Sequence, residues 1–238
     1  MPRENYRERL DELRDGVVAM GETVCDRLDD AIEAAVTGDD ELAQSVIGTD
    51  HEVNETYLAL EDECTELLAL QQPVAGDLRL VAASFKIITD LERVADLATN
   101  LAAYGGPDGG VHPAVDVRAL GEAAREMVAD AVAAYAARDP DACREIASRD
   151  DAFDDRCRQA SEAVVRDLLE ADRARTEACD ADGDTDGGAT DGEALEASLD
   201  DVSQALLAVR DLERIADHAV NVAARALYMI ENDDELIY

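Results

Sequence analysis

The sequence contains no tryptophan, and aromatic residues make up only 3% of its 238 positions. Proteins built from β-strands depend on aromatic and β-branched side chains, which pack well on a pleated surface. Here the apolar positions are mostly Ala, Leu, Val and Ile, and Ala and Leu are strong helix formers. The composition therefore favours an all-α fold.

Basic residues are scarce: Lys and Arg total 21 against 57 Asp and Glu, and Lys86 is the one lysine. A formal net charge of -36 leaves no basic face to neutralise nucleic-acid phosphates, so we expect no nucleic-acid partner. So many carboxylates would repel one another in dilute buffer, whereas at molar salt the Debye length falls to about 3 Å. The charge balance predicts a halophile with a salt-rich cytoplasm.

Cysteine pairs and long apolar runs are also missing. The five cysteines are odd in number and form no Cys-x-x-Cys motif, which argues against a disulfide framework and a thiolate zinc site. No apolar run approaches the roughly 18 residues of a membrane span, and the start, MPRENYRERL, is charged rather than signal-like. We expect a cytoplasmic protein whose cysteines are reduced.

Motifs for catalysis are absent as well. The sequence has no phosphate-binding GxxxxGK(S/T) loop, no Glu-x-x-His pair of the di-iron kind, and no serine nucleophile with a plausible base. The three histidines, His51, His112 and His218, are scattered, and we interpret them as bystanders. We expect that the protein is not an enzyme.

What the sequence does contain is helical periodicity. Apolar residues recur at three- and four-residue intervals between residues 10 and 35, and further helices are predicted over about 40–70 and 77–104. Acidic residues at 37–41, and Pro73 with Gly76, supply the breaks between them. Three long helices joined by short turns predict an antiparallel bundle.

The second half of the sequence repeats the first. Residues 31–50 align with residues 131–150, and the string DLERVADLATN at 90–100 returns as DLERIADHAVN at 211–221. We call these two copies the duplicated string. The fold prediction is therefore all-α, with two tandem antiparallel three-helix bundles related by internal duplication.

The first bundle is predicted at residues 1–106 and the second at residues 107–238. The second copy is longer than the first, and the additional residues lie at about 176–193, in a stretch of Asp, Gly, Thr and Ala. We interpret this stretch as a solvated acidic linker.

Three polar residues lie on successive helical turns in each copy of the duplicated string: Glu92, Asp96 and Asn100, and then Glu213, Asp217 and Asn221. The Glu is expected at the edge of the buried face and the Asp further outward. Such carboxylates converge on one cation, and an all-oxygen cluster suits Mg²⁺, Ca²⁺, Mn²⁺ or ferric iron rather than zinc. In so acidic a chain isolated pairs arise by chance, but the whole string recurs.

A second pair of carboxylates recurs on the first helix of each half: Asp26 with Asp30, and Glu126 with Asp130. Because the first and third helices of a three-helix bundle run parallel, we expect four carboxylates to meet at one level of each bundle. Two other interpretations stay open. The carboxylates form a solvated face, or arginines such as Arg93 hold them in ion pairs.

The acidic stretch carries a further pattern at residues 182–193. Asp182, Asp184, Asp186, Gly187 and Glu193 have the spacing of an EF-hand calcium loop. The eighth loop position is Ala189 rather than a bulky apolar residue, and no partner loop exists, so calcium binding here stays an alternative.

With QQPVAGDLR at 71–79 followed by KIITDLERVADLATNLA at 86–102, the chain resembles the PhoU family of phosphate-uptake regulators over essentially its whole length. The resemblance implies a cytosolic negative regulator that docks on the ATPase and permease of the phosphate-specific ABC transporter. It also implies a homodimer and, where one exists, a phosphate-sensing histidine kinase as a further partner. The Pro-x-Ala-x-Asp-Leu-Arg string has no clear counterpart in the second half, where EALEASLDD stands.

The resemblance also bears on the carboxylates, because members of the family can bind metal through Glu/Asp-x-x-x-Asp pairs. By position it implicates the duplicated string, at Glu92, Asp96, Glu213 and Asp217, and extends to the first-helix pairs. The competing interpretation is a carboxylate-rich helical protein that binds or stores metal, and a purely structural dimerising bundle is a third.

Overall fold

The computed structural model describes residues 3–71, 73–105, 111–181 and 190–237, and within these ranges it contains helices and no strand. The all-α prediction is confirmed. The helices are α1 (Arg3–Thr37), α2 (Asp40–Gly48), α3 (Asp50–Gln71), α4 (Gly76–Ala103), α5 (Val117–Ala137), α6 (Pro140–Ala181) and α7 (Thr190–Glu231).

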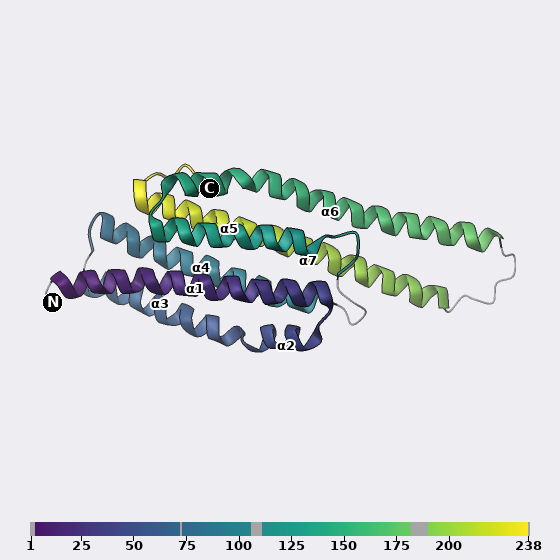
Figure 1. Cartoon of the computed structure of the whole chain (residues 1–238), viewed down its shortest axis with the longest axis horizontal. Coiled ribbons are helices and arrows are strands. Elements are labelled where there is room, and N and C mark those ends of the chain that lie inside the picture. The colour runs from purple at the N-terminus through teal and green to yellow at the C-terminus, as the bar shows by residue number, and fades with distance from the viewer. Residues whose placement is uncertain (1–2, 72, 106–110, 182–189, 238) are drawn as a thin grey trace.

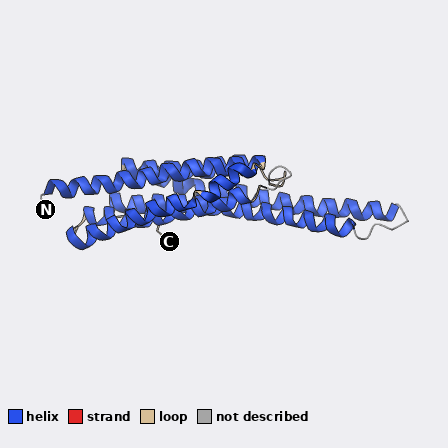
Figure 2. Cartoon of the chain, turned by 90° about the horizontal axis from the view of Figure 1, so that it is seen from below, coloured by secondary structure: helices blue, strands red, loops and turns tan. Residues whose placement is uncertain are grey.

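The helices form two bundles, one from each half of the sequence. Helices α1 to α4 pack together as the first bundle, and α5, α6 and α7 pack together as the second. Figure 1 shows the bundles side by side in an elongated molecule, and Figure 2 shows the same molecule turned by 90°. The predicted tandem pair of three-helix bundles is confirmed, with α2 and α3 together in the place of one helix.

The break between α2 and α3 was not predicted, because the sequence pattern indicated one helix over about 40–70. Thr49 is a turn between Gly48 and Asp50. The buried guanidinium of Arg27 from α1 inserts at this turn, where its Nη2 donates to the carbonyl oxygen of Val46 at 2.6 Å. In an unbroken helix that oxygen would accept the N–H of Asp50, so the inserted side chain accounts for the break.

Helices α6 and α7 are 42 residues long each, and their joined ends extend beyond the rest of the molecule (Figure 1). Helix α6 continues to Ala181 and α7 begins at Thr190, so helix covers both ends of the stretch predicted as a linker at 176–193. Residues 182–189 lie outside the described residues. The division into domains at residues 106 and 107 falls between α4 and α5 and stays a prediction.

The two bundles pack on each other through two helix pairs, α1 with α5 and α4 with α7. Helix α5 runs opposite to α1, since Arg125 pairs with Asp29 and the earlier Arg118 pairs with the later Glu33. Buried apolar residues of both bundles form one continuous core. Among the helices described, none combines the length and the apolar character that crossing a membrane requires.

Candidate functional site

The duplicated string lies in the middle of α4 and of α7, with the orientation predicted from the sequence. Glu92 and Glu213 are half-buried beside the core, whereas Asp96 and Asp217 are exposed. Leu91 and Leu212, which precede the two glutamates, are fully buried. The apolar positions therefore anchor each string and leave the Glu-x-x-x-Asp pair at the rim of the bundle.

In the second bundle the pair meets two carboxylates of α6. Asp150 and Asp154 lie one turn apart on α6, and one oxygen of each lies within 4.8 Å of an oxygen of Asp217 on α7. The Oδ1 atoms of Asp150 and Asp154 are buried and have no hydrogen-bond partner. We call Asp150, Asp154, Glu213 and Asp217 the α6–α7 cluster.

Crowding of negative charge shifts the acidity of this cluster. Burial, followed by the charges of Asp154 and Asp217, raises the pKa of Asp150 to about 6. Burial and the neighbouring aspartates also raise the pKa values of Asp154 and Glu213. Each carboxylate disfavours ionisation of the others, so a bound proton or a bound cation would relieve the repulsion within the cluster.

The corresponding level of the first bundle is arranged differently. Asp50 of α3 stands where Asp150 stands in the second copy, and it lies near Glu92 and Asp96 of α4, because its charge helps to raise the pKa of both, after burial. Asp50 is not free, however. Its Oδ1 accepts hydrogen bonds from Arg27 Nη2 and from Thr99 Oγ1, each at 3.1 Å.

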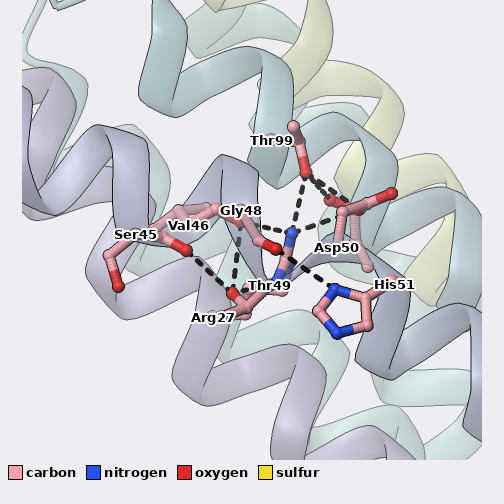
Figure 3. Close-up of polar contacts among 9 residues, drawn as sticks. Arg27, Ser45, Val46, Gly48, Thr49, Asp50, His51 and Thr99 are labelled. Carbon is pink, nitrogen blue, oxygen red and sulfur yellow. Dashed lines mark hydrogen bonds and ion pairs between the residues drawn. The ribbon is translucent and has the colours of Figure 1, made fainter.

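Arg27 is the centre of this polar contact (Figure 3). Its side chain is only 7% exposed, and its two terminal nitrogens reach both the α2–α3 turn and α4. Nη1 donates to Thr49 Oγ1 at 2.8 Å, and Nη2 donates to Thr99 Oγ1 at 3.0 Å. Its positive charge also lowers the pKa of Asp96, against the larger effect of burial.

The first residue of each duplicated string, Asp90 or Asp211, does not belong to the carboxylates at the rim. It lies at the contact between the two bundles. His218 of α7 hydrogen-bonds through Nδ1 to Oδ1 of Asp90 on α4, at 3.0 Å. Tyr104, the residue that caps the C-terminus of α4, donates from its hydroxyl to Oδ2 of Asp211 on α7, at 2.8 Å. Both aspartates are buried. His218, interpreted from the sequence as a bystander to catalysis, makes a structural contact that joins the two bundles.

The first-helix pairs do not enter the α6–α7 cluster. Asp26 and Asp30 are exposed beside a shallow hollow near Thr49, and Glu126 is exposed on α5. Asp130 pairs with Arg149 of α6, with 2.6 Å between Oδ2 and Nη1. Among the described residues the converging carboxylates come instead from the second helix of the bundle, so the expected meeting of the first and third helices is not observed.

Sequence reasoning missed Asp50, Asp150 and Asp154, although a signal for the first two was present. The alignment of residues 31–50 with residues 131–150 ends on Asp50 over Asp150. Asp154 and Arg27 carry no such signal, because their repeat-matched positions hold Asn54 and Met127.

Two other interpretations of the sequence concern the 182–193 loop and the cysteines. The calcium loop considered as an alternative at 182–193 lies largely outside the described residues. Four cysteines, Cys25, Cys64, Cys143 and Cys157, are free and buried, and burial raises the pKa of each thiol to about 11 or 12. These four are therefore poor nucleophiles in the folded protein.

The α6–α7 cluster fits a hard cation. Four carboxylates without His or Cys supply only oxygen ligands, which Mg²⁺, Ca²⁺, Mn²⁺ and ferric iron prefer. The two buried oxygens that lack a donor would gain one strong partner from a bound ion. The first-bundle level does not fit as well, because a guanidinium already contacts its central carboxylate.

Comparison with known proteins places the chain in a family. The profile of the PhoU domain matches residues 17–104, 117–183 and 188–226. A protein of Pseudomonas putida named phosphate-specific transport system accessory protein PhoU homolog is 32% identical over 235 residues, which cover 97% of this chain and 82% of that protein. The phosphate-specific transport system accessory protein PhoU of Escherichia coli K12 is 29% identical over 236 residues. These residues cover 96% of this chain and 86% of that protein.

Solved structures agree with these sequence matches. The crystal structure of PhoU from Pseudomonas aeruginosa superposes with a TM-score of 0.81 at 29% identity, covering 96% of this chain and 100% of that chain. The phosphate transport system regulatory protein PhoU from Streptococcus pneumoniae superposes with a TM-score of 0.76 at 23% identity, covering 96% and 98%. At that identity the second likeness shows the fold alone.

Proposed function

The chain belongs to the PhoU family, and on that premise we propose that it is an accessory protein of phosphate transport that restrains uptake when phosphate is ample. The observation that carries this proposal is the near full-length match to relatives named phosphate-specific transport system accessory proteins. The restraint is exerted by docking on the cytosolic ATPase and permease side of the phosphate ABC transporter. A phosphate-sensing histidine kinase is a further partner where the cell has one.

The proposed mode of action is binding rather than catalysis. Among the described residues, polar groups make structural contacts, as in the His218–Asp90 pair, or form the α6–α7 cluster. The elongated surface of long helices suits contact with a partner protein (Figure 1). We propose that the protein works in the cytoplasm, as a homodimer, and contacts the membrane only through its partners.

A metal ion is the second part of the proposal. Asp150, Asp154, Glu213 and Asp217 would hold one hard cation between α6 and α7 and so tie the two helices together. The ion would neutralise part of the charge that raises the pKa of Asp150. Docking would then depend on the metal, because the geometry of the α6–α7 surface changes with the charge at the cluster.

Deletion of the gene tests the regulatory role. Cells without the protein should import more phosphate, or accumulate more polyphosphate, in replete medium, measured with radiolabelled phosphate. Unchanged uptake in the deletion strain would contradict the proposal.

Complementation of the deletion strain tests whether the regulatory role depends on the proposed metal site. The wild-type gene should restore restraint, and the Asp150→Asn/Asp154→Asn variant should not. The matched control is Asp151→Asn/Asp155→Asn, which removes two exposed charges from the same helix. Full restraint by the first variant would leave the regulatory role standing and remove metal dependence.

The carboxylate clusters also favour one alternative, a metal-binding or storage protein. Storage would require many ions per chain, whereas the regulator needs about one at the α6–α7 cluster. Elemental analysis of protein purified in molar salt distinguishes them by the number of ions retained.

A further inference from the structure

The two bundles are copies in sequence, but their polar levels are not equivalent. Position 27 of the first copy holds Arg, whereas the matched position 127 holds Met, and both side chains are buried. Position 54 holds Asn, whereas position 154 holds Asp. The first copy has therefore gained a positive charge and lacks one negative charge relative to the second.

The positive charge of the first copy is held in place by several contacts. The Arg27 guanidinium donates to the carbonyl of Val46, to the hydroxyls of Thr49 and Thr99, and to the carboxylate of Asp50. These partners come from the α2–α3 turn and from α4, so the group bridges the elements that line this level (Figure 3). A bound metal ion would have to displace it.

The second copy keeps the matched aspartate, Asp150, but lacks the arginine and both threonines of this arrangement. Val220 stands at the position matched to Thr99, Met127 has no charge, and Arg149, at the position matched to Thr49, turns to Asp130. Helix α6 is continuous through Asp150, whereas its counterpart in the first bundle breaks where Arg27 enters. Two buried carboxylate oxygens consequently remain without donors in the second copy.

The arrangement of the carboxylates also differs between the two copies. Asp150, Asp154 and Asp217 converge within 4.8 Å, whereas Asp50, Glu92 and Asp96 do not form such a group although all three are described. In the first copy the guanidinium draws Asp50 towards α1 and Thr99. In the described part of the second copy, no basic side chain forms an ion pair with Asp150, Asp154 or Asp217 and so competes with an incoming cation.

We infer that Arg27 is an internal cation that takes the place of metal in the first bundle, so that the protein binds one hard metal ion, between α6 and α7. This inference rests on the metal part of the proposed function and specifies which copy carries it. Arg27 keeps the first bundle permanently in the charge-neutralised arrangement. The second bundle reaches that arrangement only with metal bound.

Manganese titration in molar KCl, which suppresses loose binding to surface carboxylates, tests the inference. Free Mn²⁺ is counted by its electron paramagnetic resonance signal. The wild type should bind one ion per chain, and Asp150→Asn/Asp154→Asn should bind none. The Asp151→Asn/Asp155→Asn control should keep the site.

Exchange of the repeat-matched residues is the decisive step. Met127→Arg should abolish binding by placing a guanidinium in the second bundle. Arg27→Met/Asn54→Asp should bind a second ion, because it removes the guanidinium from the first bundle and gives that bundle the carboxylates of the second. If that variant does not fold without metal, its refolding should depend on Mn²⁺, whereas wild-type refolding should not.

The number of ions bound distinguishes the role of Arg27 from the proposed metal dependence. Two ions bound by the wild type, one of them lost in Glu92→Gln/Asp96→Asn, would overturn the role of Arg27 and leave a metal-dependent regulator. No ion bound by the wild type would overturn both. A second site gained on removal of Arg27 would support both.

Discussion

At the scale of single residues, identical motifs acquire different chemistry from their neighbours. Glu92 and Asp96 face Asp50, which Arg27 engages, whereas Glu213 and Asp217 face Asp150 and Asp154. The duplicated string is therefore only half of each site, and the helix opposite it decides what the string can bind.

The raised pKa of Asp150 predicts a pH dependence of stability in metal-free protein. The folded pKa of about 6 exceeds the ordinary value of 3.8, so the folded state holds this proton more tightly than the unfolded state does. The contribution to stability is present below about pH 4 and is lost as the pH rises through about 6. With a chelator present, Asp150→Asn should remove this loss and be more stable than the wild type at pH 7.

Urea unfolding at pH 5 and pH 7 measures the effect, as the difference between variant and wild type at each pH. Asp167→Asn, which removes an exposed charge further along the same helix, is the control. A variant that follows the wild-type profile would show that Asp150 is not desolvated in the folded protein.

At the scale of elements, two glycines determine how closely α1 and α5 approach. A Cβ added at Gly21 would lie 2.6 Å from Val132, and one at the repeat-matched Gly121 would lie 2.7 Å from Ile32. Val132 and Ile32 are themselves repeat-matched, so the same contact occurs twice between the bundles.

Gly21→Ala and Gly121→Ala should each destabilise the protein by about 1–3 kcal/mol, because Val and Ile are stiff at χ1 and the helices must separate. Denaturant unfolding measures the change. Gly48→Ala is the control, since a Cβ at Gly48 meets nothing within 4 Å. Equal stability of Gly21→Ala and Gly48→Ala would show that α1 and α5 adjust without cost.

At the scale of the whole molecule, the excess of negative charge is the feature that most affects stability. The net charge of -36 is spread over an elongated surface, and the arginines that pair with carboxylates bridge α1 to α5 and α6 to α7. Exposed pairs of this kind contribute little individually. The balance between repulsion and packing therefore depends on screening by salt.

The melting temperature should rise as KCl increases from 0.1 M to about 3 M, because screening removes repulsion over distances longer than about 3 Å. Circular dichroism at the helix bands measures it. A flat melting temperature over this range would contradict the predicted salt-rich cytoplasm, which otherwise stays a prediction.

The sequence by itself determined the helical class, the tandem bundles and the duplicated string, but not the break between α2 and α3. Apolar spacing dictates which face of each helix is buried, so α4 was predicted within about one residue at each end and Glu92 was placed correctly at the rim. The spacing of apolar residues is a local property of each helix. It predicts the buried face correctly because each helix must bury its apolar residues in the folded chain.

Only the tertiary structure decided which side chains meet across helices. The partners of Asp217 come from α6 rather than from the first-helix pair on α5, and a break at Thr49 admits Arg27 in one copy alone. Such contacts depend on the rotation of each helix about its axis and on a side chain entering a backbone turn. Neither quantity is encoded in the spacing of apolar residues along one helix, so two nearly identical strings ended in two different electrostatic environments.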